Sequence, residues 1–101
     1  MPDQSITVKV AKDLEDLIPT FFKNRTKEVE TLRAALASGD FEQLRQLGHR
    51  MKGVGNSYGF EQVSVIGKQI EDAAKASDRG AVEARLAEYA DYLGRVKVVY
   101  E

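Results

Sequence analysis

The chain has 101 residues, which is enough for one domain around a single hydrophobic core. Its formal net charge of −1 gives no reason to expect nucleic acid or an anionic membrane as a partner. Cysteine is absent, which excludes disulfides and thiolate metal sites and fits a cytoplasmic protein. Since no apolar stretch approaches the ~20 residues of a membrane span, the sequence predicts no membrane insertion.

The first residues differ in pattern from the rest of the chain. Residues 6–10 (Ile-Thr-Val-Lys-Val) look extended. A lone strand has nothing to pair with, so we expect residues 1–12 to form an N-terminal arm. Residues 13–17 then predict a short additional helix.

The hydrophobic spacing from Pro19 onward predicts four amphipathic helices. Pro19 fits the first turn of a helix that runs to about residue 37. Gly39 suits a left-handed stop, and Asp40 and Asp78 suit the caps of later helices. The first two expected helices end at about residues 37 and 58. The third shows helical spacing at Val63, Ile66, Ile70 and Ala73, and the fourth at Val82, Leu86, Tyr89, Leu93 and Val96. Because the connections are short, we expect an all-α fold, an antiparallel up-down four-helix bundle over residues 13–98 with a C-terminal tail at 99–101.

His49 is the only histidine of the chain, and it lies among glycines in the second of these helices. A glycine inside a helix costs about 1 kcal/mol relative to alanine, so Gly48, Gly53 and Gly55 together cost roughly 3 kcal/mol. That is a sizeable share of the about 5–15 kcal/mol that stabilises a small domain. Glycines that carry this cost beside the imidazole indicate that another molecule or another helix comes close to the backbone near His49.

A helical wheel separates the two faces of this helix. The apolar residues cluster within about 80°, and His49 lies about 170° from their centre, so the imidazole is expected to project outward. The polar face that it shares comprises Glu42, Arg45, Gln46, Lys52, Gly53 and Asn56. The glycines Gly48 and Gly55 lie on another side, where they allow a neighbouring helix to come close.

This arrangement suits phosphoryl chemistry. Imidazole is a good nucleophile near neutral pH because its ordinary pKa is about 6.5. A phosphoryl group would bring a charge of about −1.5 to −2. Lys52 at position i+3 and Arg45 at position i−4 are spaced to pair with it. Gly53 at i+4 clears space beside the ring.

The residues around His49 resemble the histidine-containing phosphotransfer (HPt) domain family. The family motif His-x-x-Lys-Gly stands here as residues 49–53, and the later glycine of the motif is Gly59, followed by Phe60. Residues 65–71 (Val-Ile-Gly-Lys-Gln-Ile-Glu) are similar to the family's apolar-Gly-x-x-apolar-Glu segment and include Gly67. The resemblance extends back to residues 40–44 and Leu47 and covers about residues 13–98.

The resemblance implies a phosphorelay intermediate without nucleotide-dependent kinase activity of its own. His49 would accept a phosphoryl group from a receiver-domain aspartate, or from a hybrid histidine kinase, and donate it to another receiver domain. The protein would need no cofactor, because the receiver supplies its carboxylates and Mg²⁺. We expect phosphorylation at Nε2 of His49, with Nδ1 held by Glu71 or another group on the adjacent helix.

Further site residues are expected around His49. Lys52, Gly53 and Arg45 are expected to support the phosphoryl group. Four further residues are expected to contact partners: Glu42, Gln46, Arg50 and Asn56. Gly59 and Gly67 are expected to be structural glycines of the motif, and the protein is expected to be a monomer.

Three other function classes are alternatives to a phosphorelay carrier. A di-metal bundle needs Glu-x-x-His pairs, whereas Gln46 precedes His49 by three residues and the chain has no second histidine, so we reject it. A helical adaptor that docks a partner without carrying phosphate is the serious alternative, and it would not need His49. A degenerate HPt-like domain is a third possibility, against which the retention of His49, Lys52 and Gly53 argues.

Overall fold

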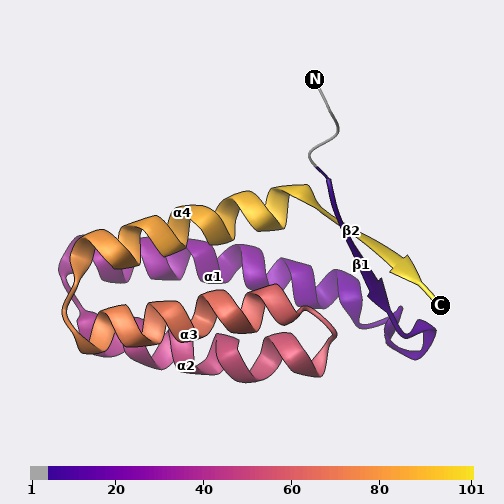
Figure 1. Cartoon of the computed structure of the whole chain (residues 1–101), viewed down its shortest axis with the longest axis horizontal. Helices are drawn as coiled ribbons and strands as arrows, with labels where there is room; N and C mark the ends of the chain where they lie inside the picture. Colours follow the sequence, from indigo (N-terminus) through magenta and orange to yellow (C-terminus); the bar gives the residue numbers. More distant parts are fainter. Residues whose placement is uncertain (1–4) are drawn as a thin grey trace.

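The computed structural model describes residues 5–101 and shows a helical bundle with a small sheet at one end (Figure 1). The four helices lie alongside one another along the longest dimension of the molecule. The elements are β1 (Ile6–Val10), a 3₁₀ turn η1 (Lys12–Leu14), α1 (Ile18–Ser38), α2 (Phe41–Ser57), α3 (Glu61–Lys75), α4 (Arg79–Arg95) and β2 (Val96–Tyr100). The predicted helical bundle is therefore present, while the antiparallel order of its helices stays a prediction.

The helix boundaries follow from local chemistry. Gly39 ends α1 with a φ of 71°, a left-handed conformation that glycine adopts without strain. The Asp40 side chain accepts a hydrogen bond from the Gln43 N–H at 3.1 Å and caps α2. Asp78 caps α4 in the same way, by accepting from the Ala81 N–H at 3.1 Å. The predicted stop and both predicted caps are confirmed.

The core runs through the middle of the bundle and is built from one apolar face of each helix. Its fully buried members come from every helix and include Leu32, Leu44, Met51, Ile70 and Tyr89. At the sheet end, the Phe21 and Phe60 rings stack with their centroids 4.8 Å apart. None of the helices in the part of the chain from residue 5 onward is long and apolar enough to cross a membrane.

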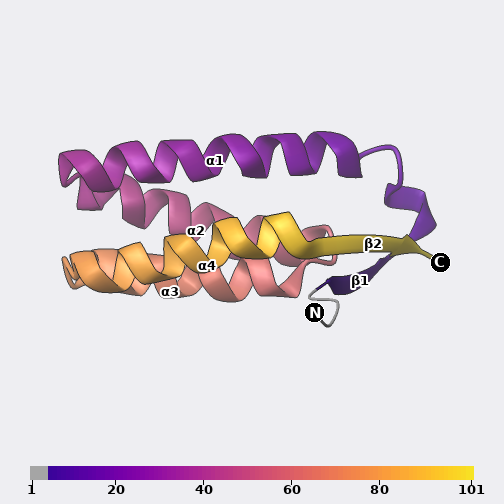
Figure 2. The same cartoon turned by 90° about the horizontal axis from the view of Figure 1, so that it is seen from above.

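The prediction that residues 6–10 have no strand to pair with is wrong. β1 pairs in parallel with β2, with Ile6 opposite Val96 and Val10 opposite Tyr100. The helical spacing at the end of α4 includes Val96, but α4 ends at Arg95, and residues 96–100 alternate between half-buried and exposed as a strand does. Figure 2 shows the two strands side by side beyond the end of the bundle. Residues 1–4 of the expected arm lie outside the described residues.

The predicted helix over residues 13–17 is also wrong. A single 3₁₀ turn at Lys12–Leu14 takes its place. The Lys12 N–H donates to the Glu101 carbonyl at 3.0 Å, which ties the chain to the sheet just where the turn begins. Five residues are too few for a stable α-helix without support, so this connection tightens into a turn.

Glycines set the distance between α2 and α3, which share the most extensive helix–helix contact of the fold. A Cβ atom added to Gly67 would lie 2.6 Å from Met51 Cβ and 2.7 Å from the Lys52 backbone nitrogen. A Cβ on Gly48 would lie 2.6 Å from the Glu71 backbone nitrogen. The two helices therefore cross with their backbones in near contact, and this crossing brings Glu71 beside the helix turn that carries His49.

This crossing predicts opposite effects for two glycine substitutions within the motif. Gly67→Ala should lower the free energy of unfolding by about 2 kcal/mol or more, because the added methyl forces α2 and α3 apart. Gly53→Ala should raise it by up to about 1 kcal/mol, since a Cβ there meets no atom within 4 Å and alanine favours the helix. Urea unfolding of both variants measures the difference, and equal effects would contradict the close crossing.

Candidate functional site

His49 lies in the third turn of α2 with its side chain 65% exposed. The apolar residues Leu44, Leu47 and Met51 of the same helix are buried, which leaves the imidazole on the opposite face. The outward orientation predicted from the helical wheel is therefore confirmed. No element of residues 5–101 buries the ring, so this part of the chain leaves it accessible to a second protein.

Glu71 of α3 holds one side of the ring. Its carboxylate oxygen Oε2 lies 2.9 Å from His49 Nδ1, and its side chain is only 6% exposed. Burial raises the pKa of Glu71, but the hydrogen bonds from His49 and Lys52 and the positive charges of Lys52 and Lys75 outweigh burial and bring the pKa below its usual value. Glu71 is therefore ionised at neutral pH.

The ionised carboxylate fixes the tautomer of the ring. A carboxylate only accepts hydrogen bonds, so Nδ1 of His49 must carry the hydrogen that it donates to Glu71. In the neutral ring, Nε2 is then left with an unshared electron pair. The expected contact between Nδ1 and Glu71 is present, and it turns the nucleophilic nitrogen toward solvent.

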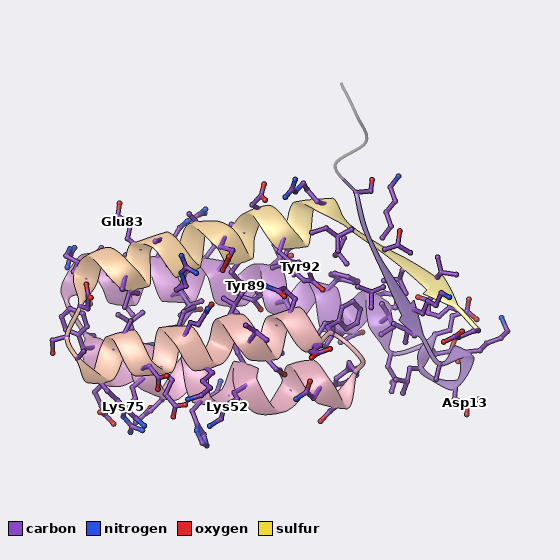
Figure 3. The ribbon with its side chains drawn as sticks, viewed as in Figure 1. Asp13, Lys52, Lys75, Glu83, Tyr89 and Tyr92 are labelled. Atoms are coloured by element: carbon purple, nitrogen blue, oxygen red, sulfur yellow. The ribbon has the colours of Figure 1, made fainter. Side chains whose placement is uncertain are left out.

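Two lysines share the same buried carboxylate. Lys52 Nζ lies 3.4 Å from Glu71 Oε1, and Lys75 Nζ lies 3.9 Å from Glu71 Oε2. Figure 3 shows both lysines on the same outer side of the α2–α3 pair. Lys75 is not among the residues predicted from the sequence, although its position four residues after Glu71 on one helix is the spacing at which an ion pair forms.

Arg45, Glu42 and Gln46 form a separate polar cluster nearer the start of α2. Arg45 Nε donates to Glu42 Oε2 at 3.0 Å, and Arg45 Nη2 binds the other carboxylate oxygen, Oε1. The Gln46 amide donates to Glu42 Oε1 at 3.2 Å. These hydrogen bonds lower the pKa of Glu42 and raise that of Arg45. The guanidinium thus has a carboxylate partner within its own helix.

The remaining predicted residues lie around this face or at the helix crossing. Gly53 is exposed, and Arg50 and Asn56 are exposed on the same helix. The Asn56 N–H donates to the buried Ser64 hydroxyl at 2.8 Å, which helps to join α2 to α3. Gly59 has a φ of 85°, and Gly67 forms the helix crossing. Gly59 thus has a left-handed backbone and Gly67 has no room for a side chain, whereas a Cβ at Gly53 would meet no atom within 4 Å.

A shallow hollow between α2 and α3 continues the His49 face. Lys52 and Asn56 border it on α2, and Lys68 and Gln69 border it on α3. Val65 lies in this hollow with 42% of its surface exposed. All the residues predicted to contact partners lie on α2, whereas the structure brings part of α3 onto the same surface.

The side chains at this site offer nucleophilic chemistry. Across residues 5–101, no three histidine or acidic side chains come close enough together to hold a metal ion. The site offers an exposed imidazole nitrogen, an ionised carboxylate that stabilises positive charge on the ring, and cations within one turn. Such a site can accept an electrophilic group from a protein that brings its own catalytic residues.

The other buried carboxylate among the described residues provides a contrast. Glu28 of α1 accepts a hydrogen bond from the Tyr89 hydroxyl at 2.9 Å and pairs with Arg25 Nε at 3.4 Å. Burial dominates at this position, so the pKa of Glu28 is raised despite these partners. Glu28 and Glu71 are therefore expected to make opposite contributions to the pH dependence of stability.

Acid should weaken the Glu71 contacts. Because the folded pKa of Glu71 is lowered, its stabilising contribution is present above the ordinary carboxyl pKa and is lost as pH falls through the folded value. We expect the wild-type protein to lose more unfolding free energy than Glu71→Gln between pH 5 and pH 3. Glu28→Gln is the matched control, for which the sign reverses because the folded pKa is raised. Urea unfolding across this pH range tests both, and parallel curves for wild type and Glu71→Gln would count against the assigned charge state.

Comparison with known protein families gives one match. The model of the family described as "Hpt domain" matches residues 9–98, which is nearly the whole chain. No curated protein and no solved structure was found to match. The matched range includes all four helices, His49 and Glu71. The chain therefore belongs to the Hpt domain family, whose members carry phosphoryl groups between the proteins of phosphorelays.

Proposed function

We propose that this protein accepts a phosphoryl group on Nε2 of His49 from a receiver-domain aspartyl phosphate, or from a hybrid histidine kinase, and passes it to an aspartate of another receiver domain. The observation that carries this proposal is the contact between ionised Glu71 and His49 Nδ1 on an exposed ring, which in the neutral imidazole leaves the unshared electron pair on Nε2. A cytoplasmic location and a monomeric state stay predictions.

The transfer requires little of this chain beyond the ring. The Nε2 electron pair attacks phosphorus, the bond from phosphorus to the aspartyl oxygen breaks, and the aspartate leaves as a carboxylate. The phosphorylated ring keeps its Nδ1 hydrogen and carries a positive charge, which the adjacent Glu71 carboxylate stabilises. In the return step, an aspartate of the second receiver attacks the same phosphorus, and the neutral ring is released.

The division of roles with the receiver is consistent with this site. Phosphoryl transfer depends on in-line positioning and on stabilisation of charge, and we expect Mg²⁺ on the receiver to supply much of the latter. Lys52 and Arg45 add positive charge on this side. Glu42, Gln46, Arg50 and Asn56 are proposed to contact the receiver, together with the exposed Val65 of α3. The protein itself needs no nucleotide site.

Phosphate should appear on His49 when the protein is incubated with a phosphorylated receiver. The label should be stable in base and labile in acid, as expected of a nitrogen–phosphorus bond, and His49→Gln should abolish it. Transfer is measured by loss of label from the receiver and its gain on this chain. A protein that binds receivers equally well with and without His49, and takes no label from any of several, would be the helical adaptor instead.

Clearance at Gly53 should matter for the approach of a receiver. Gly53→Gln should slow transfer from a phosphorylated receiver about tenfold or more, because a side chain at i+4 from His49 keeps the two reacting atoms apart. Gly94→Gln on α4 is the matched control, since a Cβ at Gly94 also meets no atom within 4 Å. Single-turnover transfer rates measure the effect. Equal rates for the two variants would contradict the proposal that the missing side chain at Gly53 lets the receiver approach His49.

A further inference from the structure

The cations near His49 already have carboxylate partners in the unphosphorylated protein. Lys52 and Lys75 pair with Glu71, and Arg45 is bound by both oxygens of Glu42. A phosphoryl group arriving on His49 brings a charge of about −1.5 to −2. To bind Lys52, Lys75 or Arg45, it must compete with Glu71 or Glu42 for that cation.

The two carboxylates differ in what the loss of a cation does to them. The Glu71 side chain is 6% exposed, so removing Lys52 would leave a buried charge less well compensated. The Glu42 side chain is 63% exposed, so water replaces its cation readily, and Gln46 still donates a hydrogen bond to it. Moving Arg45 away from its carboxylate should therefore cost less free energy than moving Lys52.

Geometry and chemistry also favour Arg45. It lies four residues before His49, and residues at this spacing are neighbours on one face of a helix. A guanidinium binds two oxygens of one phosphoryl group at once, which an ammonium cannot do in the same planar geometry.

We propose that Arg45 is an exchange cation, which Glu42 holds in the unphosphorylated protein and which moves to the phosphoryl oxygens when His49 is phosphorylated. This inference rests on the proposed function for the presence of phosphate on His49. The exchange leaves Glu42 without its cation, so the two states of the carrier differ in charge about two helical turns from the ring. Glu42 is then the competitor that limits how strongly Arg45 binds the phosphoryl group.

The exchange can be tested without any receiver domain. Phosphoramidate, a small phosphoryl donor, can label His49 directly, since Nε2 attacks phosphorus and ammonia leaves. The second ionisation of the phosphoryl group is then followed by ³¹P NMR between pH 5.5 and pH 9. Arg45→Ala should raise this pKa by about 0.5 unit or more, because a nearby cation favours the dianion.

Glu42→Gln should lower the phosphoryl pKa, but only while Arg45 is present. Glu42 lies about two turns from His49, where salt screens most of its direct effect, so its influence should pass through Arg45. The double variant should therefore match Arg45→Ala alone. Glu30→Gln is the matched control, because Glu30 pairs with Arg33 at the same i,i+3 spacing on α1, with an N–O distance of 2.8 Å.

A second measurement follows the guanidinium itself. The Arg45 Nε–H signal in ¹H–¹⁵N spectra should shift on phosphorylation, while that of Arg33 should stay in place. Both side chains of the Glu42–Arg45 pair reach solvent, so circular dichroism should show that the variants remain folded.

The outcomes separate this inference from the proposed function. A phosphoryl pKa unchanged in Arg45→Ala, or an equal effect of Glu42→Gln with and without Arg45, overturns the exchange while His49 is still labelled. Labelled protein that shows the exchange but transfers phosphate to no receiver overturns the proposed function alone. Failure of phosphoramidate to label His49 contradicts both.

Discussion

The hydrogen bond between Glu71 and His49 is the interaction on which the rest of the site depends. It exists because α2 and α3 cross with almost no space between their backbones, and glycines at positions 48 and 67 make that crossing possible. The buried carboxylate fixes the hydrogen on Nδ1 and leaves Nε2 free in solvent. The helix packing and the chemistry of the ring are therefore consequences of the same two missing side chains.

The helical part of the fold could be predicted from the sequence because each boundary has a local cause. Gly39, Asp40 and Asp78 end or cap helices through contacts within a few residues, which sequence patterns report directly. The sheet could not be predicted in this way, because β1 pairs with a strand about 90 residues later in the chain. Val96 fits the helical spacing as well as the strand pattern, and only the partner strand decides between them.

The site shows the same division between local and long-range causes. The exposure of His49 follows from the period of its own helix, and the sequence predicted it. How readily Glu71 and Glu42 release their cations depends on burial, which differs between a carboxylate under a helix crossing and one on an open helix face. Spacing alone had assigned Arg45 to the phosphoryl group, whereas the structure shows it bound by Glu42 in the unphosphorylated protein.

The most direct test of this account is the protonation state of the His49 ring in the unphosphorylated protein, measured by ¹⁵N NMR with selectively labelled histidine at about pH 8. The account predicts a protonated Nδ1 and an unprotonated Nε2 in the wild-type protein, with a weaker preference in Glu71→Gln. A ring that carries its hydrogen on Nε2, or a wild-type tautomer that Glu71→Gln leaves unchanged, would contradict it.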